Sequence, residues 1–185
     1  PKQLRKVIKH LTPLHEPLGA PGPGDWLQEH KEPGQSFGQY LRCNPVTAHG
    51  SRNVLYVQPL GEFSDTQRKI IELSSDYMSI YFNVEVKILK DVPLSMIPEK
   101  ARRKHPTWNV KQILSTYVLD DLLPPLLPND GLAIIAFTAS DLWPGHNWNF
   151  VFGQASIRDR VGVWSIHRNG DPDLNEKSFT RCLSL

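Results

Sequence analysis

The stretch that most constrains the fold is Leu132–Thr138 (LAIIAFT), which is apolar at nearly every position. Strands with one face in water alternate apolar and polar residues, whereas strands covered on both faces do not. This run therefore predicts a central strand of a mainly parallel sheet. Parallel neighbours need long crossover connections, which are usually helical, so helices are expected to pack on the sheet.

The residues before this run follow a strand, helix, strand pattern. Two β-rich stretches, Asn53–Pro59 and Val84–Leu89, flank a helix that we expect from Ser64 to about Phe82. Ser64 and Gln67 have the spacing of a capping box, and apolar residues recur after them at helical intervals. This order is the unit from which parallel sheets are built.

A second helix is predicted between the second strand and the apolar run. Asn109 and Gln112 repeat the capping spacing, and an apolar stripe continues to Leu122. The helix must end before Pro124, because proline disfavours helical geometry in the residue before it.

Two further strands follow with no helix between them. They are Asn149–Ser156 (NFVFGQAS) and Val161–His167 (VGVWSIH), joined by residues 157–160. A parallel crossover needs a dozen or more residues, so one of the two strands must run antiparallel to the rest. The sequence thus predicts an α/β fold with a mixed open sheet of about five strands. Most of these strands are parallel, one is an antiparallel edge strand, and helices back the sheet.

The first 52 residues differ in composition from the rest. P-G and G-P pairs recur there, as in Pro21–Gly24, and only Ser36–Leu41 suggests a short helix. Because proline removes backbone donors and glycine raises the entropic cost of order, we expect residues 1–52 to form a Pro/Gly-rich arm and 53–185 the α/β domain. These glycines do not indicate a phosphate loop, since no strand precedes them and proline lacks the N–H groups required.

The last residues begin another helix. Asp173 and Glu176 have capping-box spacing, and Phe179 and Cys182 follow at helical intervals. No glycine, asparagine or proline stop signal follows before Leu185. We expect the helix to be shortened from a longer one, with a frayed terminal helix as the alternative.

Charge and hydropathy argue against several classes of partner. The chain has 21 Lys and Arg against 19 Asp and Glu, and a net charge of +2 does not favour nucleic acid or a membrane surface. No apolar run approaches the roughly 18 residues that span a bilayer, and the first residues lack the apolar segment of a secretory signal. The distant Cys43 and Cys182 are expected to be reduced thiols in a cytoplasmic protein.

Few residues carry obvious chemistry. The seven histidines are scattered and no H-E-x-x-H occurs, so the helical zinc pair is missing. His146 lies near Asp141 in a loop, where a metal or proton-transfer role competes with simple solvation. The basic run Lys100–Lys104 (KARRK) fits a phosphate or acidic partner, or a solvated loop face. We assign no catalytic and no metal-ligating residue.

Aromatic residues concentrate in the last part of the chain. They are Trp143, Trp148, Phe150, Phe152 and Trp164. Aromatic residues at alternate strand positions normally belong to the core. The functional interpretation is an exposed edge strand, whose unpaired N–H and C=O groups bind an extended peptide.

Several long stretches resemble the archaemetzincins, which are zinc-dependent metallopeptidases of the metzincin clan. They are NVLYVQPLG (53–61), HPTWNVKQIL (105–114), AFTASDLWPG (136–145), NWNFVFGQAS (147–156) and RVGVWSIHRNGDPD (160–173). GDWL and EPGQSFGQYL of the arm are similar to bacterial members. The resemblance covers essentially the whole chain and implies a metzincin-like upper subdomain.

The resemblance also implies a substrate site. It makes 149–156 the antiparallel edge strand along the cleft, where it hydrogen-bonds the main chain of a peptide or protein substrate. The implied substrate-binding residues are Asn149, Phe150, Val151, Phe152, Gly153, Gln154 and Ala155.

The family's zinc residues are absent from this chain. In the archaemetzincins a helix after the fifth strand bears H-E-x-x-H and a third histidine; the histidines bind zinc and the glutamate is the general base. The helix near Asp173 would be cut before its first ligand. Zinc is therefore the implied cofactor of the family, while the chain as given is expected to be an inactive N-terminal part.

Two other interpretations remain. The chain is alternatively a non-catalytic peptide-binding module that uses the edge strand 149–156. A nucleotide-binding α/β domain is disfavoured, because no glycine loop follows Asn53–Pro59.

Overall fold

A computed structural model describes the chain except for residues 1, 17–18, 49, 146 and 185. The chain divides into two compact units, residues 1–45 and 46–185. Each is described by itself.

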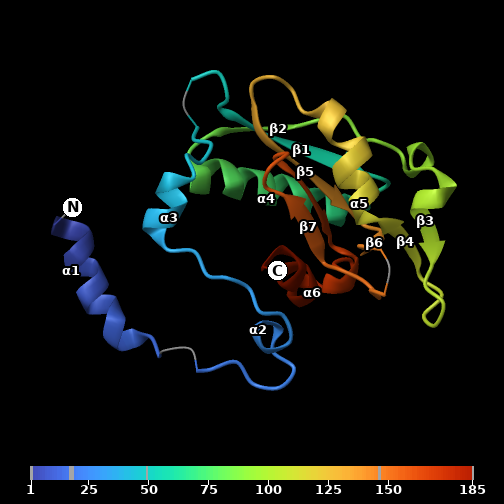
Figure 1. Ribbon diagram of the computed structural model, residues 1–185. Helices are drawn as coiled ribbons and strands as arrows, with labels where there is room; N and C mark the ends of the chain where they lie inside the picture. The colour runs from blue at the N-terminus through green and yellow to red at the C-terminus, as the bar shows by residue number, and fades with distance from the viewer. Residues whose placement is uncertain (1, 17–18, 49, 146, 185) are drawn as a thin grey trace. The chain divides into compact units, whose positions relative to one another are not determined.

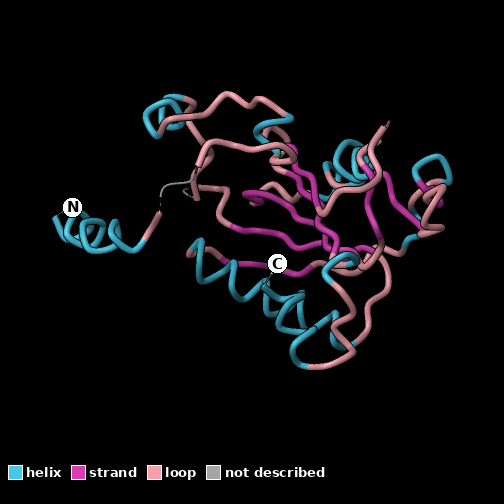
Figure 2. The backbone as a smooth tube through the Cα atoms, turned by 90° about the horizontal axis from the view of Figure 1, so that it is seen from below, coloured by secondary structure: helices cyan, strands magenta, loops and turns pink. Residues whose placement is uncertain are grey.

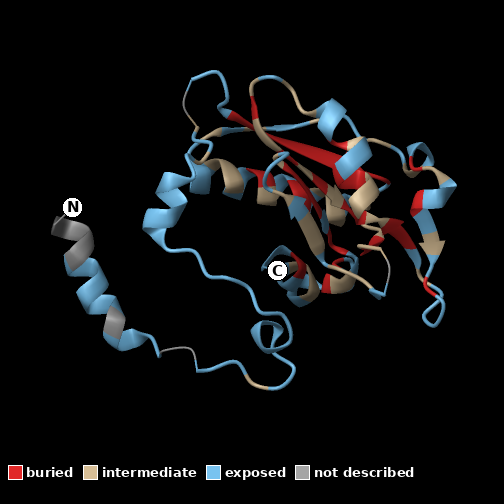
Figure 3. Cartoon of the chain, in the orientation of Figure 1, coloured by how far each residue is buried: buried red, intermediate tan, exposed pale blue. Residues whose placement is uncertain are grey.

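The first unit consists of short helices joined by extended segments (Figure 1). They are α1 (Lys2–Leu11), η1 (Thr12–Leu14), α2 (Trp26–Glu29) and α3 (Phe37–Arg42). α3 confirms the short helix predicted from the sequence and begins with a capping box between Ser36 and Gln39. The sequence analysis does not predict α1. None of the side chains described in this unit is buried (Figure 3), so these helices form no core of their own.

The second unit contains a mixed sheet. Its described residues form five strands in the order β2–β1–β5–β8–β7. The strands are β1 (Val54–Leu60), β2 (Glu85–Ile88), β5 (Gly131–Thr138), β7 (Gly153–Ser156) and β8 (Val161–Ser165). All are parallel except β7, which runs antiparallel to β8 at one edge. The mixed sheet with one antiparallel edge strand is thereby confirmed.

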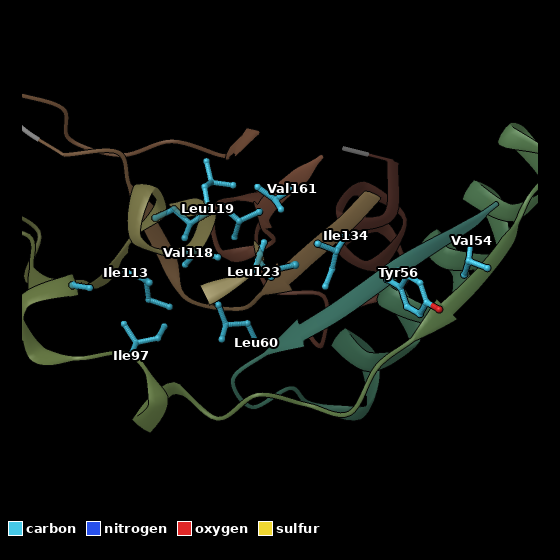
Figure 4. Close-up of a cluster of buried hydrophobic side chains, with 14 residues drawn as sticks. Val54, Tyr56, Leu60, Ile97, Ile113, Val118, Leu119, Leu123, Ile134 and Val161 are labelled. Carbon is cyan, nitrogen blue, oxygen red and sulfur yellow. The ribbon is translucent and has the colours of Figure 1, made fainter. Parts of the chain in front are cut away.

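The apolar run forms the middle of this sheet. β5 pairs with β1 on one side and β8 on the other. One face of these strands carries a buried apolar cluster (Figure 4), to which Tyr56, Ile134 and Val161 contribute. The cluster is covered by Val118 and Leu119 of the π-helical segment η4 (Val118–Leu122). The residues of β5 alternate largely between buried and intermediate exposure, so the cluster covers one face fully and the other face is partly covered.

The long helix α4 (Asp65–Phe82) lies on the opposite face (Figure 2). Ser64 Oγ accepts from the Gln67 N–H at 3.2 Å, and Gln67 Oε1 accepts from the Ser64 N–H at 3.0 Å. Ile70 and Ile71 are buried beneath β1 and β5, and the helix ends at Asn83, whose φ of 52° is left-handed. The predicted helix and its capping box are confirmed.

The predicted start of the second helix is wrong. Lys111–Leu114 forms strand β4, and helical structure begins only with α5 (Ser115–Tyr117). Asn109 caps no helix: it has a φ of 55° and donates its backbone N–H to the His105 carbonyl in a tight turn. The capping spacing is a local signal, and pairing of β4 with strands on both sides overrides it.

That pairing creates a second sheet with the order β3–β4–β6. β3 is Arg102–Lys104 and β6 is Asp141–Trp143. β3 runs antiparallel and β6 parallel to β4. Of the basic run KARRK, Arg102–Lys104 form the edge strand β3, and Lys100 and Ala101 belong to the short helix before it. The remaining short helices are η2 (Leu94–Met96), η3 (Glu99–Ala101), η5 (Pro124–Leu126) and η6 (His167–Asn169).

The last helix is present, but its predicted cap is wrong. α6 spans Glu176–Ser184, and Asn175 Oδ1 accepts from the Ser178 N–H at 3.0 Å. Asp173 instead accepts from Ser64 Oγ at 2.8 Å. Because a helix N-terminus carries partial positive charge, the start of α4 is a favourable place for this carboxylate.

Asp173 makes the stability of the fold depend on pH. Hydrogen bonds from Thr66 and Ser64 hold the pKa of its carboxyl below the ordinary value of 3.8. Since the pKa is lower in the folded chain, the stabilisation is present above the unfolded value and is lost as the pH falls through the folded value. We expect the wild type to melt above Asp173→Asn at about pH 6 and the difference to be smaller at about pH 3, below the ordinary pKa of 3.8. Melting temperatures that differ equally at both pH values would contradict this.

Candidate peptide-binding edge

β7 has one free side. It is last in the sheet order, and the Ser165 N–H donates to the Phe152 carbonyl at 2.8 Å. In an antiparallel pair, successive residues point their backbone groups alternately toward and away from the partner. Gln154 therefore faces β8, while the N–H and C=O groups of Gly153 and Ala155 face away from it. Within the described chain, no strand pairs with β7 on that side.

The seven residues predicted to bind substrate fall into two groups. Phe152, Gly153, Gln154 and Ala155 lie on or beside this free edge. Asn149, Phe150 and Val151 precede the regular strand and make internal contacts, so the strand is shorter than the predicted Asn149–Ser156.

The internal contacts of the preceding segment begin at Val151. Its N–H donates to the Leu142 carbonyl of β6 at 3.0 Å. The Asn149 carbonyl accepts from Gln112 Nε2 at 2.8 Å and from Arg103 Nη2 at 3.1 Å. The second sheet therefore occupies the side of residues 149–151 that an isolated edge strand would leave open.

A buried carboxylate anchors these contacts. Asp141 is 0% exposed. Arg168 Nε donates to Asp141 Oδ1 at 2.8 Å and Arg168 Nη2 donates to Oδ2 at 2.7 Å. Gln112 Nε2 donates to Asp141 Oδ2 at 2.8 Å. Burying an ion is costly unless it is paired and hydrogen-bonded. Arg168 supplies the opposite charge, and Arg168 and Gln112 together supply the hydrogen bonds.

Arg103 extends the network to the segment before β7. Arg103 Nε donates to Gln112 Oε1 at 2.8 Å, and Nη2 also donates to the Trp148 carbonyl at 3.0 Å. Its guanidinium lies over the Trp143 ring, 4.6 Å from the centroid. Burial lowers the pKa of Arg103, and the negative charge of Asp141 opposes that shift. The rigid fork of an arginine suits these several acceptors.

Aromatic side chains cover the network. Arg168 lies 3.6 Å from the Phe150 ring centroid and 4.8 Å from that of Trp108. Phe150 and Phe152 meet edge to face, with centroids 5.6 Å apart. Phe152 is 47% exposed and continues this aromatic surface to the start of the free edge. The edge therefore offers apolar side-chain contacts next to free backbone groups.

The His105 ring contacts the side chain of Asn149 and the turn that follows His105. Its Nδ1 accepts from the backbone N–H groups of Thr107 and Trp108, each at 3.2 Å. The ring proton then resides on Nε2, which faces Asn149 Oδ1 at 3.3 Å. The ring also stacks on Trp108, with centroids 4.0 Å apart.

Gly153 leaves room for a tryptophan on one face of the edge. A Cβ at Gly153 would lie 2.1 Å from the Trp164 ring, which sits directly across the pair. Trp164 is 41% exposed and borders an apolar groove of about 690 Å³ between α4, α6 and the sheet. On the other face, Gln154 Oε1 accepts from Ser115 Oγ at 2.6 Å. The edge strand is therefore held on both faces while its free side stays open.

The described residues do not fit a zinc ion. Among them, no group of three His, Cys, Asp or Glu side chains is close enough to hold a metal. Asp141 accepts hydrogen bonds from Arg168 and Gln112. The predicted partner, His146, lies outside the described residues.

The residues that hold the segment before β7 are not predicted from the sequence. Gln112 is interpreted there as a helix cap and Arg103 as one member of a basic run. His105 and Arg168 are not assigned any role. A buried aspartate directly after an apolar strand is the signal that points to them, because it requires a cationic partner.

Comparisons with known proteins agree with this architecture. No model of a known protein family matches the chain. Human Archaemetzincin-2 is 31% identical over 173 residues, which cover 90% of this chain and 47% of that protein. Mouse Archaemetzincin-2 is 32% identical over 187 residues, covering 98% of this chain and 52% of that protein. The chain thus spans about half the length of these relatives.

Solved structures give the same result. The archaemetzincin crystal structure from Methanopyrus kandleri matches with a TM-score of 0.54 and 29% identity, over 72% of this chain and 68% of that chain. The archaemetzincin from Archaeoglobus fulgidus shares the fold, with a TM-score of 0.50 and 24% identity over 69% of this chain and 68% of that chain. The sheet and its antiparallel edge are those of an archaemetzincin fold. The sequence relatives and the solved structures together support an archaemetzincin family assignment.

The contacts of Arg103 predict a stability effect. Arg103→Ala should lower the free energy of unfolding by about 1–3 kcal/mol, because Gln112 and the Trp148 carbonyl lose a donor. Urea unfolding followed by tryptophan fluorescence measures this change.

Arg102→Ala is the matched control for that measurement. It removes the same kind of side chain from the neighbouring position, where the side chain is exposed. A change within about 0.5 kcal/mol is expected there. Equal losses in the two variants would contradict the role assigned to Arg103.

Proposed function

We propose that these 185 residues form the substrate-binding part of an archaemetzincin-type zinc-dependent metallopeptidase. In this proposal an extended peptide or protein substrate adds to the free side of β7. Peptide-bond hydrolysis by the zinc-activated water of such enzymes requires ligands that are not among the residues described here. The chain alone is then a binding part and not a complete catalyst.

The free backbone groups of β7 carry the proposal. Gly153 and Ala155 point their N–H and C=O groups away from β8, and the network of Asp141, Gln112 and Arg103 holds the segment before them. A preorganised edge reduces the entropic cost of binding an extended chain. Phe152 and Gln154 flank the backbone groups and are the side chains best placed to contact a ligand.

A non-catalytic peptide-binding module is the second candidate. The same free edge supports it, together with the absence of a three-residue metal group from the described part of the chain. An in-frame H-E-x-x-H in adjoining coding sequence would favour the peptidase over this module.

We also propose a cytoplasmic location. Cys43 and Cys182 are both free thiols, which is usual in a reducing compartment. Burial raises the pKa of Cys182. No described helix combines the length and apolar character needed to cross a bilayer.

A proline in β7 tests the binding edge. Ala155→Pro removes an N–H that faces the free side, and edge strands tolerate proline at such positions. We expect at least about tenfold weaker binding of a fluorescein-labelled hexapeptide of alternating valine and threonine, measured by anisotropy. Ala155→Thr keeps the N–H and should bind like the wild type. Unchanged binding by the proline variant, or none by the wild type, would contradict the proposal.

Metal analysis tests the division between binding and catalysis. After incubation with a zinc salt and desalting, the 185-residue chain should retain well under one zinc per molecule and should not cleave casein. A zinc peptidase that contains H-E-x-x-H, taken through the same steps, should keep its ion and its activity. One tightly held zinc per chain would overturn this expectation.

A further inference from the structure

The second sheet exposes three cationic side chains on one face. Arg102 and Lys104 of β3 lie two residues apart, and Lys104 pairs directly with Lys111 of β4. Because residues two apart on a strand, and residues paired across strands, share a face, the three side chains project together. All three are exposed. We call these three residues the basic edge.

The basic edge carries uncompensated charge. No ion pair from the described residues reaches Arg102, Lys104 or Lys111, whereas Arg68, Lys69, Lys87 and Arg168 each have an acidic partner. Like charges directly opposite each other on paired strands destabilise a sheet. An anionic ligand would relieve this repulsion.

The basic edge also borders a hollow. A cavity of about 530 Å³ is lined by Arg102, Lys104 and Lys111, with Leu94 and Ile113 providing apolar surface. Ile113 is 3% exposed, so its side chain closes the floor against the core. Glu99 is the acidic residue of this lining. A concave surface with clustered positive charge concentrates the field that attracts an anion.

The outer edge of β3 pairs with no other strand of the described chain. β3 is last in its sheet, at the outer edge of the second unit (Figure 1). The His105 N–H donates to the Val110 carbonyl at 2.8 Å, so residues 105 and 103 face β4 in the alternating pattern. The backbone groups of Arg102 and Lys104 therefore face away from β4. The Arg102 N–H donates to the Glu99 carbonyl of η3, so the Arg102 C=O and the N–H and C=O of Lys104 are the groups open to a ligand.

We propose that the basic edge binds an acidic, extended polypeptide segment. The Arg102 C=O and the N–H and C=O of Lys104 pair with its main chain, and the three cations bind its carboxylates over the apolar floor. Lysine and arginine on an edge strand also serve to prevent pairing with other strands. That role does not require the apolar cavity that adjoins this edge. This surface is distinct from β7 and its proposal does not depend on the proposed function.

Charge reversal tests the proposal. The probe is a fluorescein-labelled octapeptide of alternating glutamate and valine, and binding is followed by anisotropy. The triple variant of the basic edge should bind the peptide at least about tenfold more weakly; it combines Arg102→Glu, Lys104→Glu and Lys111→Glu. The control combines Lys90→Glu, Arg158→Glu and Lys177→Glu, which makes the same charge change at exposed positions elsewhere. Thermal melts confirm that both variants fold.

The outcomes separate the possible ligands. Three results support the proposal. The basic-edge variant alone loses binding of the acidic octapeptide, and Ala155→Pro binds it like the wild type. An octapeptide with glutamine in place of glutamate binds much more weakly. Equal loss in both triple variants indicates non-specific charge and overturns it. Tighter binding of inorganic phosphate or of a single-stranded oligonucleotide than of the acidic octapeptide also overturns it, as does no binding by the wild type.

Discussion

The buried carboxylate of Asp141 joins parts of the molecule that are far apart in the sequence. It receives Arg168 from the segment after β8 and Gln112 from β4. Removing a carboxylate from water costs several kcal/mol, so the aspartate can be buried only where these donors converge. This requirement fixes β6 beside β4 and places η6 against both.

The same network determines what β7 can do. The side-chain amide of Gln112 donates both to Asp141 and to the Asn149 carbonyl. Arg103 donates to Gln112 and to the backbone of the segment before β7. Backbone groups of residues 149 and 151 are thereby already hydrogen-bonded within the protein. The pairing with β6 ends at Val151 and a bend follows at Phe152, so the backbone groups of Gly153 and Ala155 stay open on the free side of β7. A polar network in the interior thus produces an accessible edge at the surface.

Local sequence signals proved reliable only where no strand competed for the same backbone. The capping box at Ser64 forms as predicted, and the short helix predicted at Ser36–Leu41 also begins with a capping box. The similar spacing at Asn109 and Gln112 instead falls in a hairpin, since β3 and β6 supply partners for β4 on both sides. At the last helix, Asp173 accepts a hydrogen bond from Ser64 at the start of α4, and Asn175 caps α6 instead.

The sequence by itself determined the central strand and the mixed sheet. An apolar run is stable only where both faces are covered, and residues 157–160 are too few for a parallel crossover, so both features follow from local chain properties. Only the tertiary structure decided the second sheet, and which residues of 149–155 remain open. Those depend on the long-range meeting of Asp141 with Gln112 and Arg168, and hydrogen bonds between distant residues leave no periodicity in the sequence.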